Sequence, residues 1–229
     1  MIDFHSHVLP GMDDGSRNVE ESIAMLRLLS QQGVDIVVAT PHFYANDESV
    51  SEFVARRGNA FEKLEGSLAP DVPKILLGAE VKYYEGISRL ENLESLRVQN
   101  SKLLLLEMPS KRWTEYVIRE LIDIACNVKY IPVLAHVERY LKYQNLSVIK
   151  QLLNAGVLFQ FNSSFIYGTF TRLIALGLFK NQTIHFLGSD CHNMTDRPPD
   201  IGKAYEIIEK KLGRDFTGAF DNFAKNFLK

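Results

Sequence analysis

The sequence predicts an α/β fold in which parallel strands form a closed or nearly closed barrel. Short runs of apolar, often β-branched residues recur along the chain, and a longer segment with helical spacing follows each run. This alternation is typical of a parallel sheet covered by helices, and the number of repeats is close to that of the eight-stranded barrel. An open, doubly wound sheet is the alternative arrangement.

Seven apolar runs are the predicted strands. They cover Ile2–Phe4, Asp35–Ala39, Lys74–Gly78, Lys102–Leu106, Ile131–Ala135, Val157–Phe161 and Ile184–Gly188. The leucines at 103–106 illustrate why parallel pairing is favoured, because a strand that is buried on both faces shows no polar alternation.

Amphipathic segments between these runs are the predicted helices. The first extends from about Asn18 to Gln32, with Asn18 as a suitable N-cap and Gly33 as a suitable stop. The others are predicted at Ser49–Leu64, Trp113–Cys126, Leu146–Asn154, Phe170–Leu178 and Ile201–Leu212, with a phenylalanine-rich last helix over 216–227.

Three smaller features complete the interpretation of the helices. Gly156 and Gly177 each follow an apolar helical stripe, so both are predicted to mark helix ends. The adjacent Arg56 and Arg57 are predicted to lie on a solvated helix face.

Composition limits the class of protein. The chain has 229 residues, 46% of them hydrophobic, which suits a single domain over 1–229 with a sizeable core. Its formal net charge of −2 does not indicate a nucleic acid or an anionic membrane as a partner. We find no apolar run long enough to span a membrane and no signal peptide, and Cys126 and Cys191 suit reduced thiols, so we expect a cytoplasmic protein without membrane insertion. The oligomeric state stays open.

Polar residues gather where the predicted strands end. Six of the seven strands finish on a histidine, aspartate or glutamate, and five of the six histidines lie at these positions. The residues concerned are His5, His7, His42, Glu80, Glu107, His136, Asp190 and His192. Carboxyl ends of parallel strands open onto one face, and imidazole with carboxylate is the usual ligand set for zinc, manganese and iron. The sequence therefore predicts a metal site at that mouth, while His185, within the last strand, is predicted to be a satisfied core histidine.

These motifs resemble those of the PHP (polymerase and histidinol phosphatase) superfamily. The resemblance is carried by His5-Ser6-His7, Thr40-Pro41-His42, Ala135-His136 and Ser189-Asp190-Cys191-His192. More narrowly, nearly the whole chain is similar to bacterial PHP-type protein-tyrosine phosphatases of capsule and exopolysaccharide operons. That closer similarity lies in the opening run 5–16, in Gly78-Ala79-Glu80 and in the run 135–140.

The resemblance implies a distorted (β/α)7 barrel with three divalent cations at its C-terminal mouth, manganese most readily, or else iron, zinc or cobalt. The first ion would take His5, His7, Glu80 and Asp190; the second would share Glu80 and add Glu107 and His136; the third would take Asp14, His42 and His192. Asp14 is preferred to its neighbour Asp13 on the family pattern alone. Arg139 and Arg197 would hold the phosphate, and the substrate would be a phosphotyrosine protein, namely a bacterial tyrosine kinase for polysaccharide export.

Elementary chemistry is consistent with that function. Neighbouring cations can share a water, lower its pKa from ~15.7 toward ~7 and neutralise phosphate charge. A guanidinium adds bidentate bonds that a lysine cannot match. The covalent route through Cys191 and Arg197 fits the Cys-x5-Arg spacing, but the segment between them lacks glycines that would turn amides toward a phosphate.

Three other functions stay open at this point. A small-molecule phosphatase, for example one for histidinol phosphate, would use the same cluster. A metal-dependent amidohydrolase commonly adds a bridging lysine, and none of the predicted strands ends in lysine. A non-catalytic scaffold would have lost ligands, and none of the expected ligands is missing.

Overall fold

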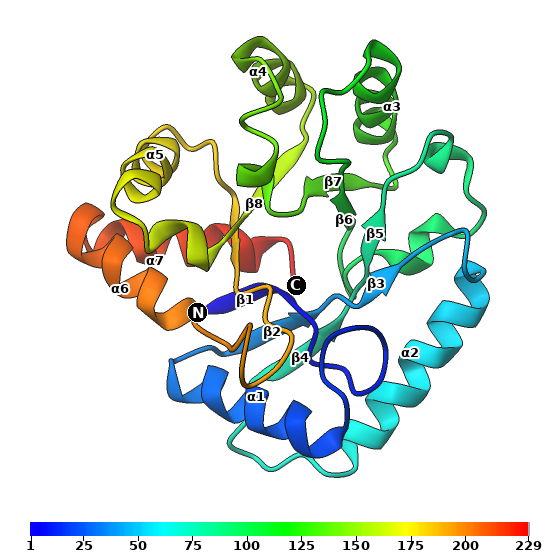
Figure 1. The fold of residues 1–229 in the computed structure, drawn as a ribbon, viewed down its shortest axis with the longest axis vertical. Coiled ribbons are helices and arrows are strands. Elements are labelled where there is room, and N and C mark those ends of the chain that lie inside the picture. The colour runs from blue at the N-terminus through cyan, green and yellow to red at the C-terminus, as the bar shows by residue number, and fades with distance from the viewer. Residues whose placement is uncertain (229) are drawn as a thin grey trace.

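The structure, a computed structural model, describes residues 1–228 and places nine strands of that range in parallel sheets (Figure 1). One sheet has the order β1-β2-β4 and the other has the order β3-β5-β6-β7-β8-β9. The strands are β1 (Ile2–Ser6), β2 (Ile36–Ala39), β3 (His42–Phe43), β4 (Lys74–Leu77), β5 (Glu80–Lys82), β6 (Leu103–Glu107), β7 (Ile131–Leu134), β8 (Leu158–Asn162) and β9 (Phe186–Gly188). Each pairing is parallel, which confirms the predicted sheet type.

The two sheets belong to one ring, because two strands of the first continue into the second. The chain breaks at Thr40-Pro41 between β2 and β3, and again at Gly78-Ala79 between β4 and β5. At the opposite side β9 returns to β1, where the Asp190 N–H donates to the His5 carbonyl at 2.8 Å. The predicted distorted seven-stranded barrel is confirmed, and the two breaks, which the sequence does not predict, are part of its distortion.

Seven α-helices of the described range surround the strands (Figure 1). They are α1 (Val19–Gln31), α2 (Val50–Glu65), α3 (Glu115–Cys126), α4 (Leu146–Asn154), α5 (Thr169–Lys180), α6 (Ile201–Leu212) and α7 (Arg214–Asn226). As predicted, the Asn18 side chain accepts the Glu21 N–H at the start of α1. Gly156 follows α4 with φ +88°, as its predicted role requires. The prediction for Gly177 is wrong: α5 continues to Lys180, because the next turn buries Phe179.

Two apolar layers hold the barrel together. Outward-facing strand residues pack against the helices, and inward-facing residues fill the barrel and meet the C-terminal helix. The inner layer consists of Ile2, Phe4, Val38, Leu76, Val98, Leu103, Leu105, Val133, Ala135 and Phe186, with Ala224 and Leu228 at its end. Phe4 and Phe186 stack with ring centroids 4.0 Å apart. The interior is therefore a packed core with a polar layer only at one mouth.

The first strand changes register where the polar layer begins. β1 pairs with β2 through Asp3↔Val37 and then Ser6↔Ala39, so one extra residue lies on β1 between these pairs. Phe4 belongs to the inner apolar layer, and the adjacent His5 lies among the polar residues of the mouth. A bulge of this kind re-aims a side chain, which is why bulges recur beside functional sites.

Arg57 is buried and bonds to backbone carbonyls, so the prediction that it lies on a solvated helix face is wrong. It is 7% exposed, and its guanidinium donates to the carbonyls of Gly78 (2.6 Å) and Ser95 (3.1 Å). The bonded carbonyl of Gly78 lies at the break between β4 and β5. Arg57 on α2 thus supports the backbone two residues before Glu80.

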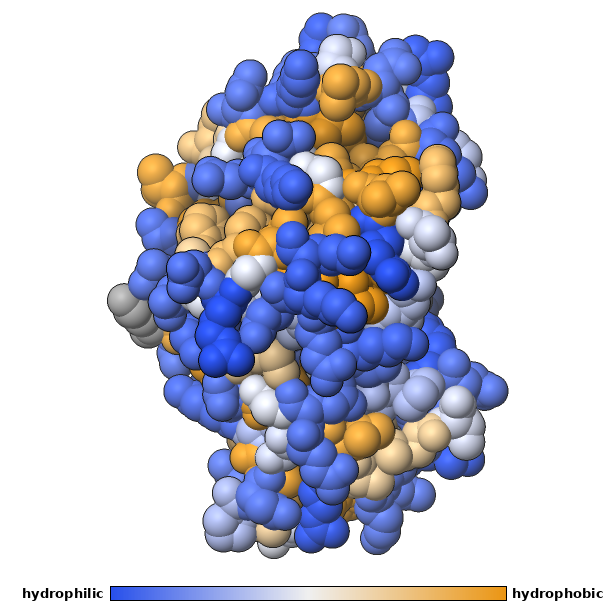
Figure 2. Space-filling view, turned by 90° about the vertical axis from the view of Figure 1, so that its left-hand side faces the viewer, coloured by the Kyte–Doolittle hydropathy of each residue, from blue (hydrophilic) through white to orange (hydrophobic). Residues whose placement is uncertain are grey.

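Apolar side chains also remain on the outside of the molecule. On α5 the side chains of Phe170, Leu173 and Ile174 are 74%, 69% and 38% exposed. Figure 2 shows the left-hand side of Figure 1, where α5 lies, and apolar residues gather over the upper part of this side. In the described range, no helix combines the length and apolar character that crossing a membrane requires.

The stability of the barrel should depend on its inner layer. We expect Leu105→Ala to lower the free energy of unfolding by about 2–5 kcal/mol, because it removes a fully buried side chain and leaves a cavity. The matched control is Leu173→Ala, where the leucine is exposed, with a change within about 0.5 kcal/mol. Denaturant unfolding with chelator present measures both, and equal effects at the two positions would contradict the assignment of the core.

Candidate metal centre

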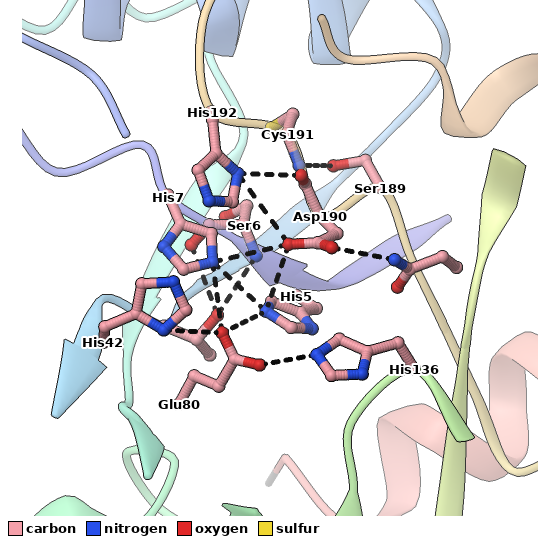
Figure 3. Close-up of polar contacts among 12 residues, drawn as sticks. His5, Ser6, His7, His42, Glu80, His136, Ser189, Asp190, Cys191 and His192 are labelled. Carbon is pink, nitrogen blue, oxygen red and sulfur yellow. Dashed lines mark hydrogen bonds and ion pairs between the residues drawn. The ribbon is translucent and has the colours of Figure 1, made fainter. Parts of the chain in front are cut away.

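The polar residues predicted at the strand ends meet at one mouth of the barrel (Figure 3). His5 and His7 come from the end of β1, His42 begins β3, and Glu80 begins β5. His136 follows β7, and Asp190 and His192 follow β9. The rings of His5, His7, His136 and His192 are at most 2% exposed. The fold therefore brings residues that are up to 187 positions apart in the sequence into one buried cluster, as their positions at the strand ends predict.

Glu80 is at the centre of the cluster. Its Oε2 lies 3.1 Å from His5 Nε2, 3.4 Å from His7 Nε2 and 3.1 Å from His42 Nδ1. Its Oε1 lies 2.8 Å from His136 Nε2. One carboxylate, itself 1% exposed, thus faces histidines from three strand ends.

Asp190 lies between the histidines and two arginines. Its Oδ1 is 3.5 Å from the Nε2 atoms of His5 and His7. Its Oδ2 accepts from Arg139 Nη2 at 2.9 Å and pairs with Arg197 Nη2 at 2.7 Å. The two arginines, named from the sequence 58 positions apart, thus converge on a single oxygen at the edge of the cluster. They line a cavity of about 170 Å³ that Asp190 also borders.

The neighbouring aspartates differ in their surroundings, which the sequence alone could not separate. Asp13 accepts from the His7 ring at 2.7 Å, from the His42 N–H at 2.8 Å and from the Gly15 N–H at 2.9 Å. Asp14 is 65% exposed, and its Oδ1 lies 3.5 Å from the Nε2 atoms of both His42 and His192. Asp13 therefore orients a histidine, and Asp14 faces the centre of the site.

Four histidine rings are oriented through Nδ1. This atom bonds to Gln160 Oε1 in His5 (3.1 Å), to Asp13 in His7 (2.7 Å), to the Tyr140 hydroxyl in His136 (3.2 Å) and to the Asp190 carbonyl in His192 (2.9 Å). Each arrangement aims Nε2 into the cluster. Such outer partners fix the tautomer of metal-binding histidines.

Sequence reasoning missed the contribution of β8, the strand that ends without histidine or carboxylate. Gln160 and Asn162 lie two residues apart and point into the barrel, where their side chains reach His5 and Asp190. The available signal was a pair of amides at alternate positions in an otherwise apolar strand.

Burial and charge act against each other on the ionisable groups. Burial favours the neutral form of Glu80, but the facing His5, His136 and His42 outweigh it and hold the pKa of Glu80 well below its usual range. Burial lowers the pKa of His5, yet Glu80 and Asp190 raise it above the ordinary value. The net effect is a compact set of opposite charges that holds the pKa of Glu80 low and raises that of His5.

The donor set fits divalent cations. Three groups have donor atoms within 4.8 Å of one another: His5, His7, Glu80 and Asp190; His7, Asp14, His42 and His192; and His42, Glu80 and Glu107. Within residues 1–228, His192 Nε2 and His42 Nδ1 are buried and have no hydrogen-bond partner. His42 Nδ1 lies 3.1 Å from Glu80 Oε2, but this contact is an ion pair and not a hydrogen bond. Buried nitrogen lone pairs of this kind are suited to a cation.

Glu107 is the carboxylate with a competing partner. Lys82 Nζ lies 2.8 Å from Glu107 Oε2. Lys82 is the last residue of β5, so the prediction that no strand ends in lysine is wrong. The error arises because β5 begins only after the break at Gly78-Ala79 and was not among the predicted strands.

The cysteines are unpaired, and neither suits nucleophilic catalysis. Cys191 is fully buried, and burial raises the pKa of its thiol well above the ordinary value. Cys126 is exposed at the end of α3. The Cys-x5-Arg route is thus excluded by the thiol, although Arg197 does reach the site.

Fold and site together define a parallel α/β barrel with a histidine–carboxylate cluster and two arginines at its C-terminal mouth. Residues 1–226 match the family described as "Capsular polysaccharide synthesis, CpsB/CapC". The chain belongs to this family.

Several relatives are similar over most of their length. The tyrosine-protein phosphatase YwqE of Bacillus subtilis is 32% identical, with 100% of this chain and 92% of the relative covered. The tyrosine-protein phosphatase CpsB of Streptococcus agalactiae is 30% identical, with coverage of 100% and 98%. Among solved structures, one from work on Bacillus subtilis YwqE and Streptococcus pneumoniae CpsB, described as metal-dependent tyrosine phosphatases, has a TM-score of 0.81. It is 28% identical, with 100% of this chain and 94% of that chain covered.

His185 lies apart from the cluster, as predicted. It precedes β9, its Nδ1 accepts the Phe159 N–H at 3.1 Å, and burial lowers its pKa to about 4. Between pH 4 and 6.5 the unfolded chain therefore binds a proton that the folded protein does not bind. The stability that this group contributes is complete above about pH 6.5 and is lost as the pH falls toward 4.

The variant His185→Gln tests this pH dependence. Between about pH 7.5 and pH 5 we expect it to lose about 1–2 kcal/mol less free energy of unfolding than the wild type. Denaturant titrations in chelator measure the difference. Parallel pH profiles for the two proteins would contradict the role of His185.

Proposed function

We propose that this chain is a metal-dependent protein-tyrosine phosphatase. The observation that carries the proposal is the convergence of Arg139 and Arg197 on Asp190 at the edge of a buried histidine–carboxylate cluster. Membership of a family whose curated relatives are tyrosine-protein phosphatases supports the same reaction. The substrate in this proposal is a phosphotyrosine protein, and a bacterial tyrosine kinase for polysaccharide export is the proposed partner.

The proposed ligands form three sets, and Glu80 is shared by the first two. His5, His7, Glu80 and Asp190 form the first set, Glu80, Glu107 and His136 the second, and Asp14, His42 and His192 the third. Two of these sets lie within groups of close donor atoms, and the other has His136 in place against Glu80. Mixed nitrogen and oxygen donors without sulfur suit manganese, with iron, zinc or cobalt as alternatives. Bound cations would supply an activated water near neutral pH and would neutralise phosphate charge.

The chain's own residues bind and orient the ester. Arg139 and Arg197 are 44% and 41% exposed, so both can reach an arriving phosphate. Their guanidinium groups offer paired N–H donors that match phosphate oxygens. Phosphate would take over the role that Asp190 Oδ2 now plays for both arginines. The phosphate would thereby be held beside the cluster.

Three further features belong to the proposal. All strands share one ring, which supports the interpretation of 1–229 as one domain. Two unpaired cysteines are compatible with a cytoplasmic location. The exposed apolar side chains on α5 are compatible with an oligomer or a protein partner and identify neither.

Turnover of a phosphotyrosine peptide tests the reaction. With Mn²⁺ present we expect hydrolysis that chelator abolishes, and we expect His136→Ala to lower kcat/KM by more than about 100-fold, because loss of a direct ligand should exceed the effect of losing an outer partner. His185→Gln is the matched control and should keep full activity, since His185 lies outside the cluster.

Two results would contradict this proposal. The absence of phosphoester turnover by fully metal-loaded protein would overturn the phosphatase function. Preferential hydrolysis of histidinol phosphate over the peptide would instead identify a small-molecule phosphatase.

The arginines should contribute chiefly to phosphate binding. We expect Arg139→Ala and Arg197→Ala each to lower kcat/KM about 10- to 100-fold, which corresponds to the loss of a charge-assisted hydrogen bond. Arg139→Lys should recover only part of this loss, because lysine lacks the paired donors. Arg119→Ala, on the exposed face of α3, is the control. Equal activity in Arg139→Ala and Arg119→Ala would exclude Arg139 from the substrate site.

A further inference from the structure

Two amides on β8 lie inside the barrel, and the proposed reaction assigns them no role beyond their contacts with His5 and Asp190. Gln160 is fully buried and Asn162 is 5% exposed. Their neighbours Phe159 and Phe161 face outward into the apolar layer against the helices. A buried amide is costly unless its donors and acceptors are bonded, so the partners of Gln160 and Asn162 reveal what holds them there.

The oxygen of Gln160 joins two parts of the cluster. It accepts the His136 backbone N–H at 2.7 Å and bonds to the His5 Nδ1 at 3.1 Å. His136 has a positive φ of 35°, which is uncommon for a residue with a side chain. Gln160 thus stabilises the strained turn that aims His136, and the same oxygen keeps a proton on Nδ1 of His5. His5 Nε2 is then the atom left to face Glu80.

The amide nitrogen of Gln160 continues the network to Asp190. It donates to Asn162 Oδ1 at 3.0 Å and to the Phe161 carbonyl at 2.6 Å. Asn162 Nδ2 in turn donates to Asp190 Oδ2 at 2.8 Å. The orientation of both amides follows from these contacts. A flip of Gln160 would place its NH₂ group against the His136 N–H, and a flip of Asn162 would place its oxygen against the Asp190 carboxylate.

Gly188 has no side chain at the point where the Gln160 side chain reaches across β9 to His5. β9 lies between β8 and β1, and Gly188 pairs with Asn162 in that sheet. A Cβ at position 188 would lie 2.5 Å from His5 Cβ and 2.9 Å from Gln160 Nε2. The contact between Gln160 and His5 across β9 therefore depends on the missing side chain.

We propose that Gln160 and Asn162 are positioning residues that set the geometry of the metal ligands from a strand that contributes no ligand itself. Gln160 fixes the tautomer of the His5 ring and the backbone turn at His136. Asn162 holds Asp190 through Oδ2. The Oδ1 atom therefore keeps facing the histidines when Arg139 and Arg197 leave Asp190 and bond to the phosphate instead. The inference rests on the proposed function in one respect, namely that the cluster binds divalent cations.

The Zn²⁺-loaded protein with ¹⁵N-labelled histidine reports the role of Gln160 directly. In the wild type we expect a slowly exchanging Nδ1–H signal from His5. Gln160→Met keeps the size of the side chain but removes the acceptor, so exchange of that proton should become at least about tenfold faster. The Mn²⁺ dissociation constant should rise about 10- to 100-fold, as for loss of other outer partners of metal ligands. Gln160→Glu restores an acceptor oxygen, and it should recover the slow His5 signal.

Asn162→Ala separates the second role from the first. The His5 signal should be unchanged, because Gln160 Oε1 is intact. At saturating Mn²⁺ the KM for a phosphotyrosine peptide should rise about tenfold with kcat within about twofold, because Arg139 and Arg197 become the remaining donors to Asp190 Oδ2 and are released less readily. A merely structural role for Asn162 would not separate KM from kcat.

The controls are Gln151→Ala on α4 and Asn222→Ala on α7, where both side chains are exposed. Mn²⁺ affinity and His5 exchange in Gln160→Met equal to those of Gln151→Ala would overturn the proposal for Gln160. Unchanged kinetic constants in Asn162→Ala would overturn it for Asn162. Metal affinity and proton exchange are measured without turnover, so an inactive wild type that binds Mn²⁺ would remove the proposed function and leave the test of Gln160 intact.

Discussion

The structure depends on one buried carboxylate, Glu80, and on what neutralises it. A charge that is 1% exposed is tolerated only when opposite charges or cations surround it. Here Glu80 faces His5, His42 and His136, and the charges of His5 and Glu80 stabilise each other. In the proposed function the nitrogen and oxygen atoms that face one another here would bind cations, so cation binding would displace protons and contribute to folding free energy.

The barrel provides this arrangement by accepting local distortion at its mouth. The extra residue in β1 turns His5 inward beside Phe4, and the breaks at Thr40-Pro41 and Gly78-Ala79 let His42 and Glu80 begin new short strands. Asp190, like His136, has a positive φ, here 54°. Strained conformations of this kind persist where surrounding bonds determine them, and they cluster at functional sites. Regular strands carry the apolar core, and irregular backbone carries the cluster.

The sequence predicts what depends on composition and period, and it fails where a single three-dimensional contact decides. The seven apolar runs and their polar ends were sufficient to predict the ring and the cluster, because parallel strands all end on one face. The distinction between Asp13 and Asp14 depends on which one meets His7, and no pattern encodes that contact. Arg57 is charged and helical, so its burial against the Gly78 carbonyl cannot be predicted from its neighbours. Gln160 and Asn162 were overlooked because amides are not metal ligands of first choice, although their alternate spacing was visible.

In the proposed phosphatase, the position of Asp190 would let one site hold both cations and a phosphate. Its two oxygens are divided: Oδ1 faces the rings of His5 and His7, while Oδ2 receives Arg139 and Arg197. In the proposed function the arginines would therefore have an anionic partner before substrate arrives, and they would not repel the cations. An anion with a single accessible oxygen would merely replace that partner at no gain. A phosphate ester offers several oxygens, so it can satisfy both guanidinium groups at once and still face the cluster. In the proposed function, selectivity for phosphate would thus follow from the competition between Asp190 and the substrate for the same two arginines.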